Sequence, residues 1–87
     1  MVAANRTKVE EILRSRLKLR TPQFDLKKEE GRISGSVIST SFKGMKDLER
    51  QRRMWDALEA EFGQESTRIV GTLLAYTPQE WDVDLEG

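Results

Sequence analysis

A row of basic residues around one neutral glutamine is the part of this chain with the clearest binding chemistry. Gln51 lies inside the row, which follows a turn that reads Phe-x-Gly. Guanidinium and ammonium groups bind phosphates and carboxylates, and backbone amides at a helix start also favour anions. The basic residues are Lys43, Lys46, Arg50, Arg52 and Arg53.

Chemistry that needs imidazole or thiol is excluded, because the sequence has no histidine and no cysteine. Disulfides, thiolate ligation of a metal and histidine base catalysis are therefore ruled out for this chain. The serines have no histidine to activate them, and neither a phosphate-binding Walker loop nor a dinucleotide fingerprint occurs. We expect no catalytic residue, no metal ligand, no cofactor and no enzymatic activity.

Length and charge indicate one small domain, residues 1–87, in which 37% of the residues are hydrophobic. Lysine plus arginine equals aspartate plus glutamate, fifteen each, which argues against a dedicated polycation on nucleic acid. The N-terminus has no apolar core of a signal peptide, and no run of residues is long and apolar enough to span a bilayer. We expect a soluble cytoplasmic protein, or an organellar one after removal of a transit peptide.

The first half of the chain predicts a helix and a hairpin. Residues 7–18 have helical apolar spacing and start with a capping box of Thr7 and Glu10. Residues 24–27 and about 33–40 alternate between apolar and polar types, so we expect two strands joined by a polar turn.

The second half predicts a long helix, a strand and a short helix. Residues 47–61 have helix period and are followed by Gly63, which is suited to end a helix. Residues 67–76 are apolar on both faces, which predicts a central or doubly covered strand. A second capping box at residues 77–80 starts a short helix, and residues 82–87 are expected to be loose.

Particular faces follow from the same pattern. The long helix is expected to turn one stripe toward the core, with Trp55 packed inside and Arg52 leaning toward it; Trp81 is expected to be partly exposed. The stripe comprises Leu48, Arg52, Trp55, Leu58 and Phe62. Together the elements predict a two-layer α+β domain in the order α-β-β-α-β-α, with a three-stranded mixed sheet and helices on one face.

Several of these residues resemble the BolA-like family. The family reads Phe-x-Gly, then Arg-His-Arg, then an aromatic residue and a leucine. The chain has residues 42–44, residues 50–52, Trp55 and Leu58 at these spacings. Residues 77–81, Thr-Pro-Gln-Glu-Trp, are similar to the closing segment of the family. The resemblance runs from about residue 7 to residue 81.

The resemblance implies a fold related to the class II KH domain and a non-enzymatic role. Family members partner monothiol glutaredoxins in iron–sulfur cluster trafficking, and some bind DNA as regulators. In the glutaredoxin complex, the histidine of Arg-His-Arg binds a two-iron cluster, with a second ligand from the loop between the first strands.

This chain departs from the family at both ligand positions. Gln51 stands at the histidine, and the loop from residue 27 to residue 31 offers only lysine, glutamate and glycine. Met45 also stands where the family has a lysine. An amide or a carboxylate does not replace imidazole or thiolate on a soft cluster, so the fold is expected without the ligands.

Two interpretations of the basic row remain. It contacts phosphate, although the turn has only the first glycine of a KH Gly-x-x-Gly loop, or it is a solvated helix face, which we favour. Gln51 is likewise either a partner contact or an ordinary exposed helix residue.

We expect a protein-binding adaptor, with a monothiol glutaredoxin as the candidate partner, or alternatively a nucleic-acid-binding regulator that uses residues 43–53. No membrane or small-molecule substrate is expected. The predicted contact surface is Phe42, Lys43, Gly44, Lys46, Arg50, Gln51 and Arg53.

Overall fold

The structure is a computed structural model that describes the backbone of residues 5–86 and the side chains of residues 5–83. Within that range the element order is the predicted one, with an added 3-10 turn before the long helix and a short helical segment after it. The elements are α1 (Arg6–Leu17), β1 (Gln23–Glu29), β2 (Arg32–Ile38), η1 (Thr40–Phe42), α2 (Asp47–Phe62), η2 (Gly63–Glu65), α3 (Ser66–Ile69), β3 (Val70–Tyr76) and α4 (Pro78–Glu86).

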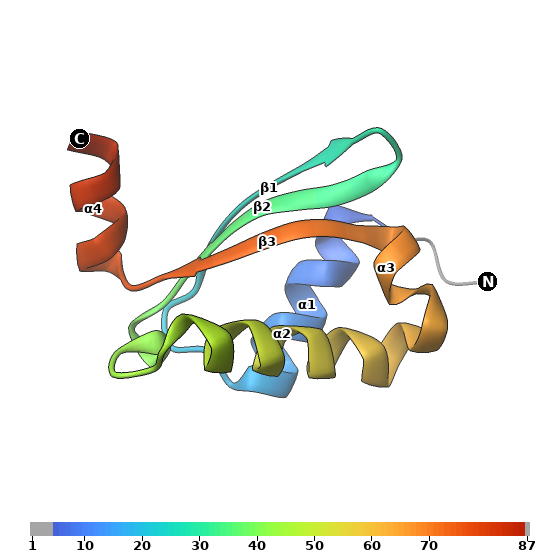
Figure 1. The fold of residues 1–87 in the computed structure, drawn as a ribbon, viewed down its shortest axis with the longest axis horizontal. Helices are drawn as coiled ribbons and strands as arrows, with labels where there is room; N and C mark the ends of the chain where they lie inside the picture. Colours follow the sequence, from blue (N-terminus) through green and yellow to red (C-terminus); the bar gives the residue numbers. More distant parts are fainter. Residues whose placement is uncertain (1–4, 87) are drawn as a thin grey trace.

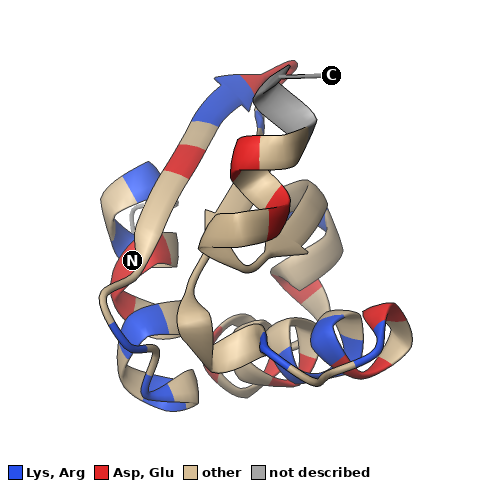
Figure 2. Cartoon of the chain, turned by 90° about the vertical axis from the view of Figure 1, so that its left-hand side faces the viewer, with Lys and Arg blue, Asp and Glu red and all other residues tan. Residues whose placement is uncertain are grey.

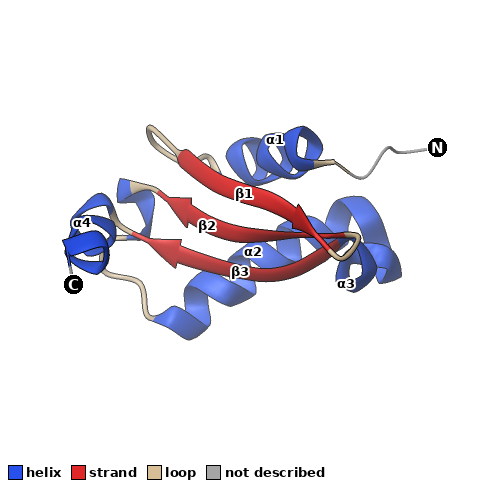
Figure 3. Cartoon of the chain, turned by 90° about the horizontal axis from the view of Figure 1, so that it is seen from above, coloured by secondary structure: helices blue, strands red, loops and turns tan. Residues whose placement is uncertain are grey.

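The described residues form a three-stranded mixed sheet covered by helices, so the predicted fold class is confirmed. β1 pairs antiparallel with β2, and β2 pairs parallel with β3, in the order β1-β2-β3. α1 and α2 lie against one face of this sheet (Figures 1 and 3). The core between the layers is apolar, with Leu13, Met54 and Leu58 at 0% exposure.

α1 begins one residue earlier than the sequence predicts, because Asn5 and not Thr7 is its N-cap. The Asn5 side chain accepts a hydrogen bond from the Lys8 amide at 2.8 Å. Asparagine is among the best N-cap residues because its side-chain oxygen satisfies an otherwise free amide of the first turn. The predicted helical apolar spacing is confirmed at Val9, Ile12 and Leu13, which are buried.

The hairpin between β1 and β2 closes with a two-residue turn. Glu30 and Gly31 both have positive φ, 51° and 81°, which matches the twist of the paired strands. β1 therefore extends to Glu29, two residues beyond the predicted strand.

β3 is an edge strand, and the prediction that it is central or doubly covered is wrong. The register shifts between two pairs, Ile33 with Val70 and Gly35 with Leu73, so β3 holds one extra residue there. This bulge lets Val70 and Leu73 both face the core although they are three residues apart. Leu74 faces away from the core and is 46% exposed.

The buried face of α2 differs from the predicted stripe. Leu48 is 71% exposed and Arg52 is also exposed, whereas Arg50, Met54 and Ala57 are buried. The predicted stripe is confirmed at Leu58, which is buried, and at Trp55 and Phe62, which pack against the core, and it is wrong at Leu48 and Arg52. Trp55 is half-buried and packs against the core, as predicted, and Gly63 ends α2 as predicted, with φ of 62°.

α4 includes residues that the sequence predicts as a loose tail. The helix continues from Pro78 to Glu86, and the predicted looseness of Gly87 lies outside the described residues. Trp81 is half-buried, and its ring centroid lies 5.3 Å from that of Tyr76 on β3. α4 rises from the end of β3, away from α2 (Figure 1). None of the described helices is both long and apolar enough to cross a membrane.

Candidate functional site

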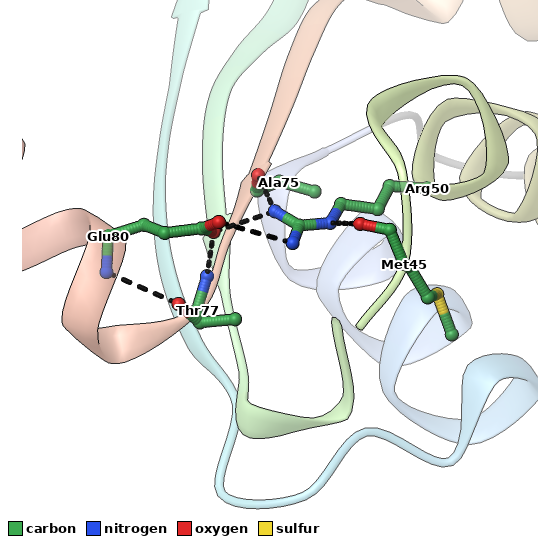
Figure 4. Close-up of polar contacts among 5 residues, drawn as sticks. All are labelled: Met45, Arg50, Ala75, Thr77 and Glu80. Atoms are coloured by element: carbon green, nitrogen blue, oxygen red, sulfur yellow. Dashed lines mark hydrogen bonds and ion pairs between the residues drawn. The ribbon is translucent and has the colours of Figure 1, made fainter. Parts of the chain in front are cut away.

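Arg50, at the start of α2, is the centre of a polar network between α2, β3 and α4 (Figure 4). The Arg50 Nη1 donates to Glu80 Oε1 at 2.7 Å, and Nη2 donates to Glu80 Oε2 at 3.3 Å. The Arg50 Nη1 also donates to the Ala75 carbonyl at 3.1 Å, and Nε donates to the Met45 carbonyl at 3.0 Å. The arginine is 5% exposed, and its charge is compensated inside the protein.

Glu80 joins this network to the capping box of α4, which the structure confirms. The Thr77 amide donates to Glu80 Oε1 at 2.8 Å, and the Glu80 amide donates to Thr77 Oγ1 at 3.2 Å. The hydrogen bonds from Arg50 are the main cause that lowers the pKa of Glu80 to about 2, and the Thr77 amide adds to the effect. Glu80 therefore stays ionised at any physiological pH.

Gln51 uses both ends of its side-chain amide. Its Nε2 donates to the Leu73 carbonyl at 2.6 Å, and its Oε1 accepts from Trp55 Nε1 at 3.3 Å. Arg50 and Gln51 thus bind alternate carbonyls of β3, those of Ala75 and Leu73, on the strand edge that faces α2. Side chains that occupy an edge in this way leave fewer groups for an incoming strand.

A shallow hollow of about 220 Å³ lies beside these contacts, between the start of α2 and β3. Leu74 lines the hollow and is 46% exposed, and Leu48, the residue after Asp47 on α2, is 71% exposed. The lining residues are Asp47, Arg50, Gln51, Leu74, Ala75 and Tyr76.

The predicted contact surface is only partly on the outside. Phe42 is 1% exposed and packs in the core, with the Arg50 guanidinium 5.9 Å from its ring centroid, so Phe42 and Arg50 are not available to a partner. Lys43, Gly44 and Lys46 are exposed, and Gly44 has φ of 82°, a conformation that glycine adopts at little cost. Whether these three bind a partner stays a prediction.

Arg53 and Arg52 bear on whether the basic row contacts phosphate or is a solvated helix face. Arg53 pairs with Glu49 one turn away at 3.3 Å, with both side chains about half exposed, which is a solvated helix face. Arg52 is exposed, and no described carboxylate pairs with it.

Two residues of the site are not predicted by the sequence pattern. The pattern places Leu74 on a covered strand, and it indicates only a capping role for Glu80. The signal for Glu80 is its place in the Thr-Pro-Gln-Glu segment, because a carboxylate there can reach beyond its own helix. Nothing local in the sequence indicates that Leu74 lies beside α2.

Comparison with solved structures decides what this arrangement is similar to. A bol-like protein from Babesia bovis is 27% identical over 98% of this chain and 95% of its own, with a TM-score of 0.63. A bolA protein homologue from Coxiella burnetii is 19% identical over 94% of this chain and 99% of its own, with a TM-score of 0.66. The BolA domain of SufE1 from Arabidopsis thaliana is 18% identical over 92% and 99%, with a TM-score of 0.62.

The fold of this chain is BolA-like. The resemblance predicted from the Phe-x-Gly turn and the closing Thr-Pro-Gln-Glu-Trp segment is thereby confirmed. No protein-family model matches the sequence, and no curated protein sequence matches it.

The BolA-like chain does not offer the donor set of a cluster-binding protein. It has no histidine or cysteine, and in its described part no group of three or more His, Cys, Asp or Glu residues could hold a metal ion. Both polar atoms of Gln51 are hydrogen-bonded within the fold, and an amide suits a soft iron–sulfur centre poorly. The residues present therefore do not fit a cluster bound by this chain.

Proposed function

We propose that this BolA-like protein acts by binding, as an adaptor for a protein partner, without catalysing a reaction. The observation that carries the proposal is the exposure of two large apolar residues: Leu74, 46% exposed, lines the hollow, and Leu48, 71% exposed, follows the lining residue Asp47 in the chain. We propose that these two side chains form one apolar contact of the kind typical of interaction sites, and that charged residues around it add specificity.

The proposed partner is a monothiol glutaredoxin-like protein in iron–sulfur or redox regulation, and the proposed location is the cytoplasm. The partner comes from the family resemblance. Lys43 and Lys46 would steer an acidic partner toward the turn before α2, and Leu48 and Leu74 would provide the apolar contact. Because Gln51 is tied to β3 and Trp55, the partner would keep any cluster on its own ligands.

The proposal is tested by isothermal titration calorimetry with a monothiol glutaredoxin. We expect Leu48→Glu and Leu74→Glu to weaken association about tenfold or more, because each places a charge in the apolar contact. Val83→Glu is the matched control, since Val83 is 65% exposed on α4 and lies outside the hollow. Lack of association with the wild-type protein, or an equal loss in all three variants, would refute the proposal.

The alternative function is nucleic-acid binding by residues 43–53. Three exposed cations, Lys43, Lys46 and Arg52, favour it, whereas Arg50 and Arg53 are already paired. Three phosphate contacts on duplex DNA would give a slope of log affinity against log salt of about −3. Filter binding over a salt series tests this, and no binding at low salt would remove the alternative.

A further inference from the structure

A cationic surface that differs from the predicted one lies where the loop after α1 meets the turn before α2. We call it the cationic end and define it as Lys18, Arg20, Lys43 and Lys46. All four are exposed, and none pairs with a carboxylate of the described residues. Figure 2 looks onto this end of the molecule, where lysine and arginine segments lie along the lower part with aspartate and glutamate segments among them.

Hydrogen bonds hold the two loops of the cationic end together. The Ser39 hydroxyl donates to the Arg20 carbonyl at 2.8 Å, and the Arg20 amide donates to the Ser41 hydroxyl at 2.9 Å. The Ser41 amide also donates to the Ser39 hydroxyl at 3.1 Å, and Ser39 is 0% exposed. The charges from two distant parts of the sequence are therefore held on one surface.

The loop after α1 keeps an unusual backbone shape. Lys18 has φ of 51° and Thr21 has φ of 41°. Positive φ is uncommon for residues other than glycine and is disfavoured for a β-branched residue such as threonine. Such conformations persist where the surroundings fix them, and here the surroundings are Ser39 and Ser41. The backbone positions of Lys18 and Arg20 are thus fixed in the protein alone.

Acidic residues are absent from both segments that build this surface. Neither aspartate nor glutamate occurs from residue 12 to residue 24 or from residue 31 to residue 46, although the whole chain has fifteen. A cation near the end of α1 complements the helix dipole, which accounts for Lys18. It does not account for Arg20 or Lys43, which lie beyond the helix.

We propose that the cationic end binds an acidic polypeptide segment. Single-stranded nucleic acid is disfavoured, because unpaired bases need exposed aromatic side chains for stacking, and Phe42, the one aromatic residue in these loops, is 1% exposed. The site goes beyond the proposed adaptor surface, since Lys18 and Arg20 lie outside the hollow, and it shares only Lys43 and Lys46 with that surface.

The test is fluorescence anisotropy with a labelled oligo-glutamate peptide at low and physiological salt. The wild-type protein binds the peptide, and salt weakens the complex because exposed charges are screened. The double variant Lys18→Glu/Arg20→Glu is expected to weaken binding at least about tenfold. The matched control, Lys28→Glu/Arg32→Glu, makes the same change in charge on the hairpin and leaves binding within about twofold.

Other outcomes overturn the proposal. Equal weakening in both double variants would mean that only total charge matters. Tighter binding of a single-stranded oligothymidine, lost in Lys18→Glu/Arg20→Glu, would assign the surface to nucleic acid. Circular dichroism checks folding, and Lys18→Gln/Arg20→Gln replaces the charge reversal if that variant unfolds. The variant Lys18→Glu/Arg20→Glu is also titrated with glutaredoxin, because Leu48 and Leu74 remain intact in it. A loss of peptide binding without a loss of glutaredoxin binding then distinguishes failure of the peptide site from failure of the adaptor surface.

Discussion

Gln51 acts in the fold at the position where the family resemblance places a ligand. Its amide donates to the Leu73 carbonyl on β3 and accepts from the Trp55 indole, so one neutral side chain connects two elements. An arginine at this position could donate to the carbonyl but could not accept from the indole. This double requirement explains a neutral residue in the row of arginines.

Replacing Gln51 with leucine should therefore destabilise the protein. The Leu73 carbonyl and the Trp55 indole each lose a partner, and we expect a loss of about 1–2 kcal/mol in the free energy of unfolding. Urea denaturation measures it. Gln64→Leu is the control, because Gln64 is exposed and makes no side-chain hydrogen bond to a described residue. Equal stability of the two variants would contradict the assigned role.

The buried arginine shows where sequence reasoning stops at the scale of the residue. The motif predicts Arg50 on a contact surface because arginine is nearly always exposed. Its burial depends on Glu80, thirty residues later, and on the Ala75 carbonyl, neither of which is apparent from the neighbours of Arg50. The motif predicts Phe42 on the same surface, whereas its ring packs in the core.

At the scale of the element, α4 depends on an ion pair that acid removes. The folded state lowers the pKa of Glu80 from 4.5 to about 2, so folding favours the ionised carboxylate. The contribution of this pair is complete above pH 4.5 and is lost as the pH falls toward 2. We expect Trp81 fluorescence to change over that window as α4 detaches.

The measurement uses a Trp55→Phe background, in which Trp81 is the one remaining tryptophan. Glu80→Gln is the comparison, because its neutral side chain cannot form the ion pair at any pH. The transition below pH 4.5 should be weaker in that variant. An identical acid transition with and without Glu80 would show that other carboxylates hold α4.

Gly35, in the central strand β2, is expected to tolerate no side chain. A Cβ at this position would collide with the Asp25 carbonyl oxygen of β1, and the φ of Gly35 is 148°. Gly35→Ala should cost about 2–4 kcal/mol in the free energy of unfolding, measured by thermal or urea denaturation.

Gly31→Ala is its matched control, since Gly31 also has positive φ but a Cβ added there would meet no atom of the neighbouring elements within 4 Å. That variant should lose about 1 kcal/mol. The steric account of Gly35 fails if the two substitutions cost the same.

Elements with one polar and one apolar face could be predicted, and those that depend on distant neighbours could not. α1 and the hairpin follow local alternation and capping. The bulge in β3 changes which residues face the core, and no local pattern marks it. The apolar residues Leu74 and Tyr76 on its outer face predict that β3 is central. In the structure, Tyr76 packs with Trp81 of α4 and Leu74 stays exposed.

At the scale of the whole molecule, the BolA-like fold forms from a chain without histidine or cysteine. The resemblance in sequence identified the fold because the Phe-x-Gly turn and the closing capping box both have structural roles, in the core and in the Arg50 network. The proposed partner surface could not be predicted in the same way, since exposure of Leu48 and Leu74 is a property of the assembled layers.

The most direct test of the account is the visible absorption spectrum of a cluster-loaded monothiol glutaredoxin, recorded with and without this protein and combined with its elution volume. We predict co-elution with an unchanged cluster spectrum, because this chain adds no ligand. A cluster spectrum altered by the wild-type chain would contradict the account, and so would failure of the two proteins to co-elute.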